Sequence, residues 1–172
     1  KLQIVESEKQ TLITLLKESS SGINILLHGK EGTGKTELAK SLGIAASKKV
    51  YFIKGAKNDS DENETKDVNW RITALIAALN VLDKKNSIIV MDEADSILNT
   101  RFSFFFRGDK TEKGAINRLL ETIEGKVIWI VNHIDFVEKS TLRRFSFSLE
   151  FKDQTKIQRL SVWENILIKR KL

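Results

Sequence analysis

The sequence predicts an α/β protein built on a parallel β-sheet that helices cover on both faces. Five runs of strand length are rich in β-branched and aromatic residues, and most are too continuously apolar for a strand with one face in water. Segments with apolar residues at helical spacing separate these runs along the chain. Strands that alternate with helices in this way form parallel sheets covered on both sides.

The first part of the chain alternates helix and strand around a glycine-rich loop. Residues 5–18 carry apolar side chains at helical spacing and are predicted to form a helix, which Ser19-Ser20-Ser21-Gly22 ends. The apolar, β-branched run 23–28 predicts the first strand, and the good helix formers of 37–46 predict the helix after the loop. Residues 50–53 predict a second strand.

The second part repeats this alternation after a polar segment, 54–66, which is predicted to be an exposed loop because it holds four acidic residues. Apolar spacing predicts helices over 68–82, 113–123 and 155–167. Buried strands are predicted over 87–91 and 127–131, and the alternating run 146–151 predicts a fifth strand.

Composition narrows the classes of protein and partner. At 172 residues, with 41% apolar and 30% charged side chains, the chain has the length and composition of one globular domain. The absence of cysteine excludes disulfides and thiolate metal sites and suits a reducing compartment, so a cytoplasmic location is expected. No apolar run reaches the roughly 18 residues that a membrane span needs. The net charge of +6 comes from scattered Lys and Arg, so binding to nucleic acid is not expected.

A phosphate-binding loop is predicted between the first strand and its helix. The segment Gly29-Lys30-Glu31-Gly32-Thr33-Gly34-Lys35-Thr36 matches G-x-x-x-x-G-K followed by Ser or Thr. Glycines let backbone N–H groups converge on a polyanion, and the helix N-terminus adds its positive dipole end. The alternative is a glycine turn that binds nothing, but the strand before the loop and the helix after it favour a nucleotide site. Its predicted binding residues are Gly29, Glu31, Gly32, Thr33, Gly34, Lys35, Thr36 and Glu37.

Within this loop, Lys35 is expected to reach the β- and γ-phosphates of a nucleotide, and the Thr36 hydroxyl to bind Mg²⁺. A second part of the site is predicted where the third strand ends, at Asp92 and Glu93. Asp92 is expected to hold the metal, and Glu93 to polarise a water for attack on the γ-phosphate. Acids that merely decorate a helix N-terminus are the alternative.

Three further residues follow the fourth strand. Asn132 stands at its end, where an amide could sense the γ-phosphate, although a strand-end Asn can also simply cap a turn. Arg143 and Arg144 precede the fifth strand. Adjacent arginines are usually a surface feature, but a guanidinium can also stabilise the charge on a transferring phosphoryl group, often in a neighbouring subunit.

Together these motifs resemble those of the AAA+ ATPases, and of the AAA clade among them. The resemblance covers most of the chain, with Walker A at 29–36, Walker B at 88–93, sensor-1 at Asn132 and the arginine-finger region at Arg143 and Arg144. It implies ATP and Mg²⁺ as ligands, and a three-layer αβα P-loop NTPase fold with a five-stranded parallel sheet in the order 5-1-4-3-2. It also implies that residues 1–172 are the large subdomain without its C-terminal helical lid, and that the protein works as a hexameric ring.

The resemblance implies that ATP hydrolysis drives remodelling of a protein or complex. Threading members of the family carry an aromatic pore loop where this chain has the polar segment 55–66, so the usual grip on peptide is not expected. A nucleotide-dependent scaffold and a DNA-handling AAA+ protein remain alternatives. A GTP switch lacks its N-K-x-D motif, since His133 stands where Lys belongs. The aromatic run 102–106 is either a buried strand or an exposed interaction loop.

Overall fold

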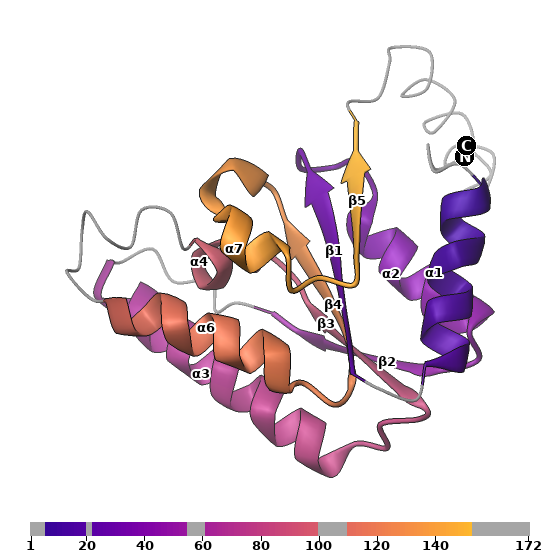
Figure 1. Ribbon diagram of the computed structural model, residues 1–172, viewed down its shortest axis with the longest axis horizontal. Helices are drawn as coiled ribbons and strands as arrows, with labels where there is room; N and C mark the ends of the chain where they lie inside the picture. The colour runs from indigo at the N-terminus through magenta and orange to yellow at the C-terminus, as the bar shows by residue number, and fades with distance from the viewer. Residues whose placement is uncertain (1–5, 20–21, 55–60, 100–109, 153–172) are drawn as a thin grey trace, which may run out of the picture.

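A five-stranded, all-parallel sheet forms the centre of the protein in the computed structural model, which describes residues 6–19, 22–54, 61–99 and 110–152 (Figure 1). The spatial order is β2-β3-β4-β1-β5, which is the predicted order 5-1-4-3-2 counted from the other edge. This confirms the P-loop NTPase architecture. The strands are β1 (Ile23–Gly29), β2 (Lys49–Ile53), β3 (Ser87–Met91), β4 (Lys126–Val131) and β5 (Phe147–Phe151).

Helices cover both faces of the sheet, as predicted (Figure 1). One face is covered by α1 (Glu6–Glu18) and α2 (Lys35–Ala45). The other carries α3 (Asp61–Val81), α4 (Asp95–Leu98), α6 (Lys110–Thr122) and α7 (Lys139–Leu142), with the short 3₁₀ helix η1 (Ile134–Phe136) between β4 and α7. Among the described residues, no helix combines the length and the apolar character needed to cross a membrane.

The central strands are buried on both faces because their side chains alternate between two apolar clusters. Ile128 and Ile130 of β4 pack with α1 and α2, whereas Trp129 packs with α3 and α6. The buried Asn24 of β1 joins three elements: its Nδ2 donates to the Leu120 carbonyl at 2.7 Å, and its Oδ1 accepts from Trp129 Nε1 at 2.9 Å. These contacts fix β1 and β4, two of the three strands that lead into the site, against α6.

One predicted boundary is wrong. The segment 54–66 was expected to be a loop, but α3 begins at Asp61, so its last residues are helical. Acidic residues are stabilised near a helix N-terminus, and this effect competes with the polar composition that suggests a loop. The short helices α4 and α7 were not predicted because each spans only four residues. The helix predicted over 155–167 and the aromatic run 102–106 lie outside the described residues.

Candidate functional site

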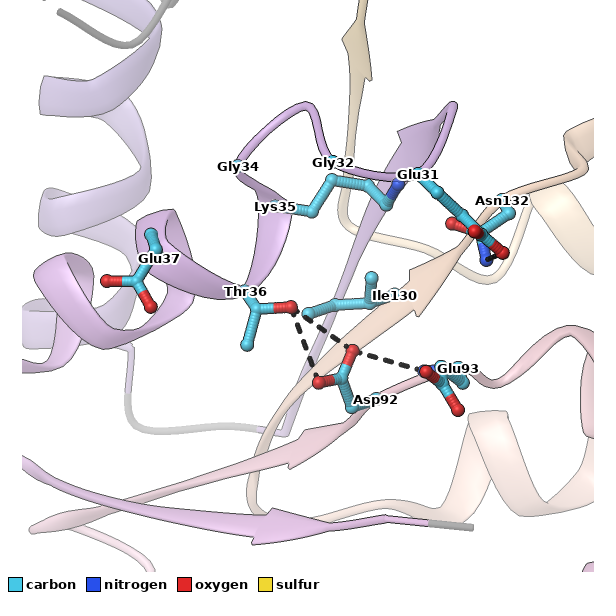
Figure 2. A pocket seen from close by; sticks show the side chains of 10 residues that line it. All are labelled: Glu31, Gly32, Gly34, Lys35, Thr36, Glu37, Asp92, Glu93, Ile130 and Asn132. Carbon is cyan, nitrogen blue, oxygen red and sulfur yellow. Dashed lines mark hydrogen bonds between the residues drawn. The ribbon is translucent and has the colours of Figure 1, made fainter. Parts of the chain in front are cut away.

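The carboxyl ends of β1, β3 and β4 meet at one edge of the sheet, and the predicted site residues converge there on a cavity of about 400 Å³ (Figure 2). The wall of this cavity comes from the loop after β1, the N-terminal turn of α2, the turn after β3 and the end of β4. Its residues are Glu31, Gly32, Gly34, Lys35, Thr36, Glu37, Asp92, Glu93, Ile130 and Asn132. The sequence motifs on three separate segments therefore form one site.

The glycine-rich loop needs its glycines at defined positions. Gly34 precedes α2 with φ 97°, a left-handed conformation that costs side-chain-bearing residues about 1–2 kcal/mol. Gly29 has φ 132°, and a Cβ there would lie 2.2 Å from the Phe151 carbonyl oxygen of β5. Thr33 is buried and its hydroxyl donates to the Lys30 carbonyl at 2.7 Å. Gly29 and Thr33 thus shape the loop, and the other predicted binding residues line the cavity.

Lys35 is buried at the start of α2, with 5% of its surface exposed. Its ammonium group donates to the carbonyl oxygens of Gly29 and Lys30. Burial lowers the pKa of Lys35, while the carboxylates of Asp95, Glu31 and Asp92 act in the opposite direction. The positive charge is therefore held on the loop backbone beside the cavity.

Thr36 and Asp92 point toward one another in the wall of the cavity (Figure 2). The Thr36 hydroxyl lies 3.3 Å from each carboxylate oxygen of Asp92. No group of three or more His, Cys, Asp or Glu side chains forms a metal cage within the described ranges. A hydroxyl and one carboxylate suit Mg²⁺, which keeps several waters and binds substrate phosphates in addition to one or two protein oxygens.

Arg71 forms hydrogen bonds to the backbone of the turn that carries Glu93. Glu93 is exposed and adopts φ 51°, a strained conformation for a residue with a side chain. Arg71 of α3 is buried, and its guanidinium donates to the Glu93 carbonyl at 3.0 Å and to the Asp92 carbonyl. The sequence did not predict this role for Arg71, because Arg71 lies on α3, far along the chain from the turn after β3, and no local sequence pattern connects the two.

Asn132 is positioned by a second residue that sequence reasoning missed. The Asp95 carboxylate accepts the backbone N–H groups of Asn132 at 2.8 Å and of His133 at 2.9 Å. The Asn132 side-chain amide then lies 3.4 Å from the carboxylate of Glu31, which belongs to the glycine-rich loop. The only hint in the sequence was that Asp95 is a further acidic residue, three positions after Asp92.

Arg143 and Arg144 lie outside the cavity wall, at the end of α7. Arg143 is exposed. Arg144 is tied within its own chain, since Nη2 lies 2.8 Å from Glu121 Oε1 of α6 and Nη1 donates to the Ser140 carbonyl. The structure therefore brings the two arginines close to each other and leaves them apart from Lys35, Asp92 and Glu93.

Comparison with known proteins gives consistent matches. Residues 25–153 match the family model described as "ATPase family associated with various cellular activities (AAA)". A proteasome-activating nucleotidase of Aeropyrum pernix is 31% identical over 126 residues, which are 69% of this chain and 30% of that protein. A protein of the same name from Archaeoglobus fulgidus is 29% identical over 187 residues, which cover 99% of this chain and 46% of the relative. The chain thus spans less than half the length of these relatives.

The fold has matches among solved structures. The crystal structure of the FIGL-1 AAA domain in complex with ADP aligns with a TM-score of 0.65 at 21% identity. The alignment covers 98% of this chain and 60% of that one. At this identity the likeness concerns the fold.

Proposed function

Because the chain belongs to the AAA family of ATPases, we propose that it binds Mg²⁺·ATP in the 400 Å³ cavity and hydrolyses it. The observation that carries this proposal is the convergence of Lys35, Thr36, Asp92 and Glu93 on one cavity at the carboxyl edge of the sheet. Ligands of parallel α/β sheets bind at this edge.

The roles follow from the position of each group. The amides of the glycine loop and the Lys35 ammonium hold the phosphates, and Lys35 exchanges its two backbone carbonyl partners for phosphate oxygens. Thr36 and Asp92 hold Mg²⁺, which neutralises phosphate charge when bound. Glu93 orients and deprotonates the attacking water, and its exposed side chain lines the cavity. Asn132 leaves Glu31 to contact the γ-phosphate.

The work done by hydrolysis is remodelling of a protein or complex, in line with the names of the proteasome-activating relatives. We propose a ring in which Arg143 or Arg144 reaches the nucleotide of the neighbouring subunit, since neither lines the cavity of its own chain. Arg143 is the better candidate, because Arg144 would first have to leave Glu121. A hexamer and a cytoplasmic location stay predictions.

The test of the enzymatic proposal is the variant Glu93→Gln, which should bind ATP as the wild type does and lose turnover. Lys35→Ala should lose binding as well. Glu6→Gln is the matched control, since it removes an equal charge from an exposed carboxylate in the first turn of α1 that lines neither this cavity nor any other described here. Turnover that is unchanged in Glu93→Gln would remove this residue from the role of base. ATP binding without phosphate release by the wild type at high protein concentration would favour a scaffold.

Mixing experiments test the arginine proposal. Arg143→Ala keeps its own cavity intact, and Lys35→Ala keeps its own arginines intact. If the arginine acts on the neighbouring subunit, mixed rings of the two inactive variants in the full-length protein regain part of the turnover. No recovery in rings shown to contain both variants would contradict action between subunits.

A further inference from the structure

A second cavity, of about 700 Å³, lies at the opposite edge of the sheet, where the strands begin. Its wall comes from the end of α1, the start of β1 and the segments that lead into β2, β3 and β4. Figure 1 shows α1, α3 and α6 ending at this edge, remote from the tips of β1 and β5. The cavity is therefore separate from the proposed ATP site.

The wall of this cavity is strongly basic. Five lysines line it, against two carboxylates, those of Glu18 and Glu124. Glu124 is already engaged, because its Oε2 lies 2.6 Å from Lys84 Nζ. The lysines are Lys17, Lys48, Lys84, Lys85 and Lys126. Several positive charges thus face one hollow without acidic partners of equal number.

Lys126 is the most informative of these side chains. It is the first residue of β4, in register with Ile23 on one side and Ile88 on the other, and it is only 5% exposed. Its ammonium makes one hydrogen bond, to the Lys84 carbonyl at 3.1 Å, and meets no carboxylate at salt-bridge distance among the described residues. Burial lowers the pKa of Lys126 and the nearby charge of Lys48 lowers it further, whereas Asp83 opposes the shift.

Buried charges in proteins are normally paired, because an unpaired charge loses its hydration without compensation. Helix dipoles do not account for this lysine. Cations are stabilised at helix C-termini, which explains Lys17 in the last turn of α1. Lys126, however, belongs to a strand, and it lines the same cavity as Lys48, which is also positively charged. An anion in this cavity would supply the counter-charge that the described carboxylates do not.

We propose that this basic cavity binds a small ligand carrying two or more phosphoryl charges. Lysine ammonium groups bind phosphate oxygens as point charges, and several of them converge here. The volume lies in the range of small-molecule sites, about 300–1,000 Å³. The described wall contains no aliphatic or aromatic residue on which a nucleobase or acyl chain could pack, so recognition is of the charged group.

The experiment follows backbone amide signals of the isotope-labelled protein by NMR during titration with inorganic pyrophosphate, without added metal. Saturable shifts at Gly22, Lys48 and Lys126 report the basic cavity, whereas shifts at Gly32 and Gly34 report the proposed ATP site. The experiment therefore tests the basic cavity and the proposed ATP site independently of each other. We expect saturable shifts at the first group, with inorganic monophosphate binding more weakly because it carries fewer charges.

Two variants define the site. Lys126→Gln and Lys48→Gln should each weaken pyrophosphate binding at the basic cavity about tenfold, the loss expected for one charged hydrogen-bonding group. Lys139→Gln removes the same charge from an exposed position on α7 and should leave the affinity unchanged. If Lys126→Gln does not fold, the affinity of Lys48→Gln for pyrophosphate tests the proposal, since the Lys48 side chain is less buried than that of Lys126.

Three results would overturn the proposal. One is the absence of saturable shifts at the first group of amides up to millimolar pyrophosphate. Another is an affinity in Lys48→Gln equal to that of the wild type. The third is a glutamate-rich peptide that binds the same amides more tightly than pyrophosphate, because this would assign the cavity to an acidic protein segment.

Discussion

Asp95 is predicted to be the residue that holds Asn132, the proposed sensor of the γ-phosphate, in place. Asp95 Oδ1 accepts the N–H groups of Asn132 at 2.8 Å and of His133 at 2.9 Å, and Oδ2 lies 3.1 Å from the same Asn132 nitrogen. In Asp95→Asn the carbonyl oxygen can still accept, but the new NH₂ group faces an N–H donor. The side chain keeps its size and loses its charge.

The magnitude follows from the number of bonds. A hydrogen bond to a charged group contributes about 1.5–3 kcal/mol, whereas one between neutral groups contributes about 0.5–1.5 kcal/mol. With two donors affected, Asp95→Asn should lower the free energy of unfolding by about 2–3 kcal/mol, and Asp95→Ala by about 3–6 kcal/mol. Urea denaturation measures both values. Glu150→Gln, which removes the same charge from an exposed carboxylate on β5, is the control.

The same variant also tests the link to the site. Because the backbone of Asn132 loses its anchor while Lys35 and Thr36 do not, ATP binding should change less than turnover in Asp95→Asn. Stability and turnover within error of the wild type for both Asp95 variants would refute the reasoning. An equal loss of stability in Glu150→Gln would show that net charge, and not the anchoring of Asn132, is responsible.

Three further predictions concern the elements that support the cavity. Gly29→Ala should lower the free energy of unfolding by about 2–6 kcal/mol, because its Cβ would meet the Phe151 carbonyl at 2.2 Å and φ is 132°. Gly32→Ala, with no atom within 4 Å of its Cβ, should lower it by only about 1–2 kcal/mol. Equal losses for the two variants in urea denaturation would contradict this prediction. Asn24→Ala should cost about 2–5 kcal/mol in the same assay, since the buried Trp129 N–H and Leu120 carbonyl lose their partner; a loss below 1 kcal/mol would count against it. Burial lowers the pKa of His28 below its ordinary value of 6.5, so the unfolded state binds the proton first and stability should fall as the pH drops below about 6.5; His28→Gln should remove that part of the pH dependence, and an unchanged slope in pH-dependent denaturation would contradict the assignment.

Local sequence was sufficient to predict the strands and the motifs at their ends. The central strands β1, β3 and β4 are short runs whose apolar character on both faces reflects their own burial, as in Ile128-Trp129-Ile130. In a parallel sheet all carboxyl ends lie at one edge, so motifs placed after β1, β3 and β4 must come together. The convergence of Thr36 and Asp92 on one cavity confirms this expectation.

Features that depend on contacts between distant segments were not predictable in the same way. Arg71 acts on the turn after β3 from another helix, and Asp95 acts on backbone groups 37 residues away. The basic cavity combines lysines from the ends of four separate segments that look like scattered surface charge in the sequence. The helical start of α3 was missed because its polar residues suit either a solvated loop or a helix N-terminus.

The central claim is that the loop before α2 grips a triphosphate next to an acidic pair. The most direct measurement is a Mg²⁺·ATP titration of the labelled protein in which backbone amide signals are followed. The account predicts saturable shifts at Gly32, Gly34, Lys35 and Thr36, with further shifts at Asp92 and Asn132. Absence of binding, or shifts confined to Lys48 and Lys126 at the opposite edge, would contradict it.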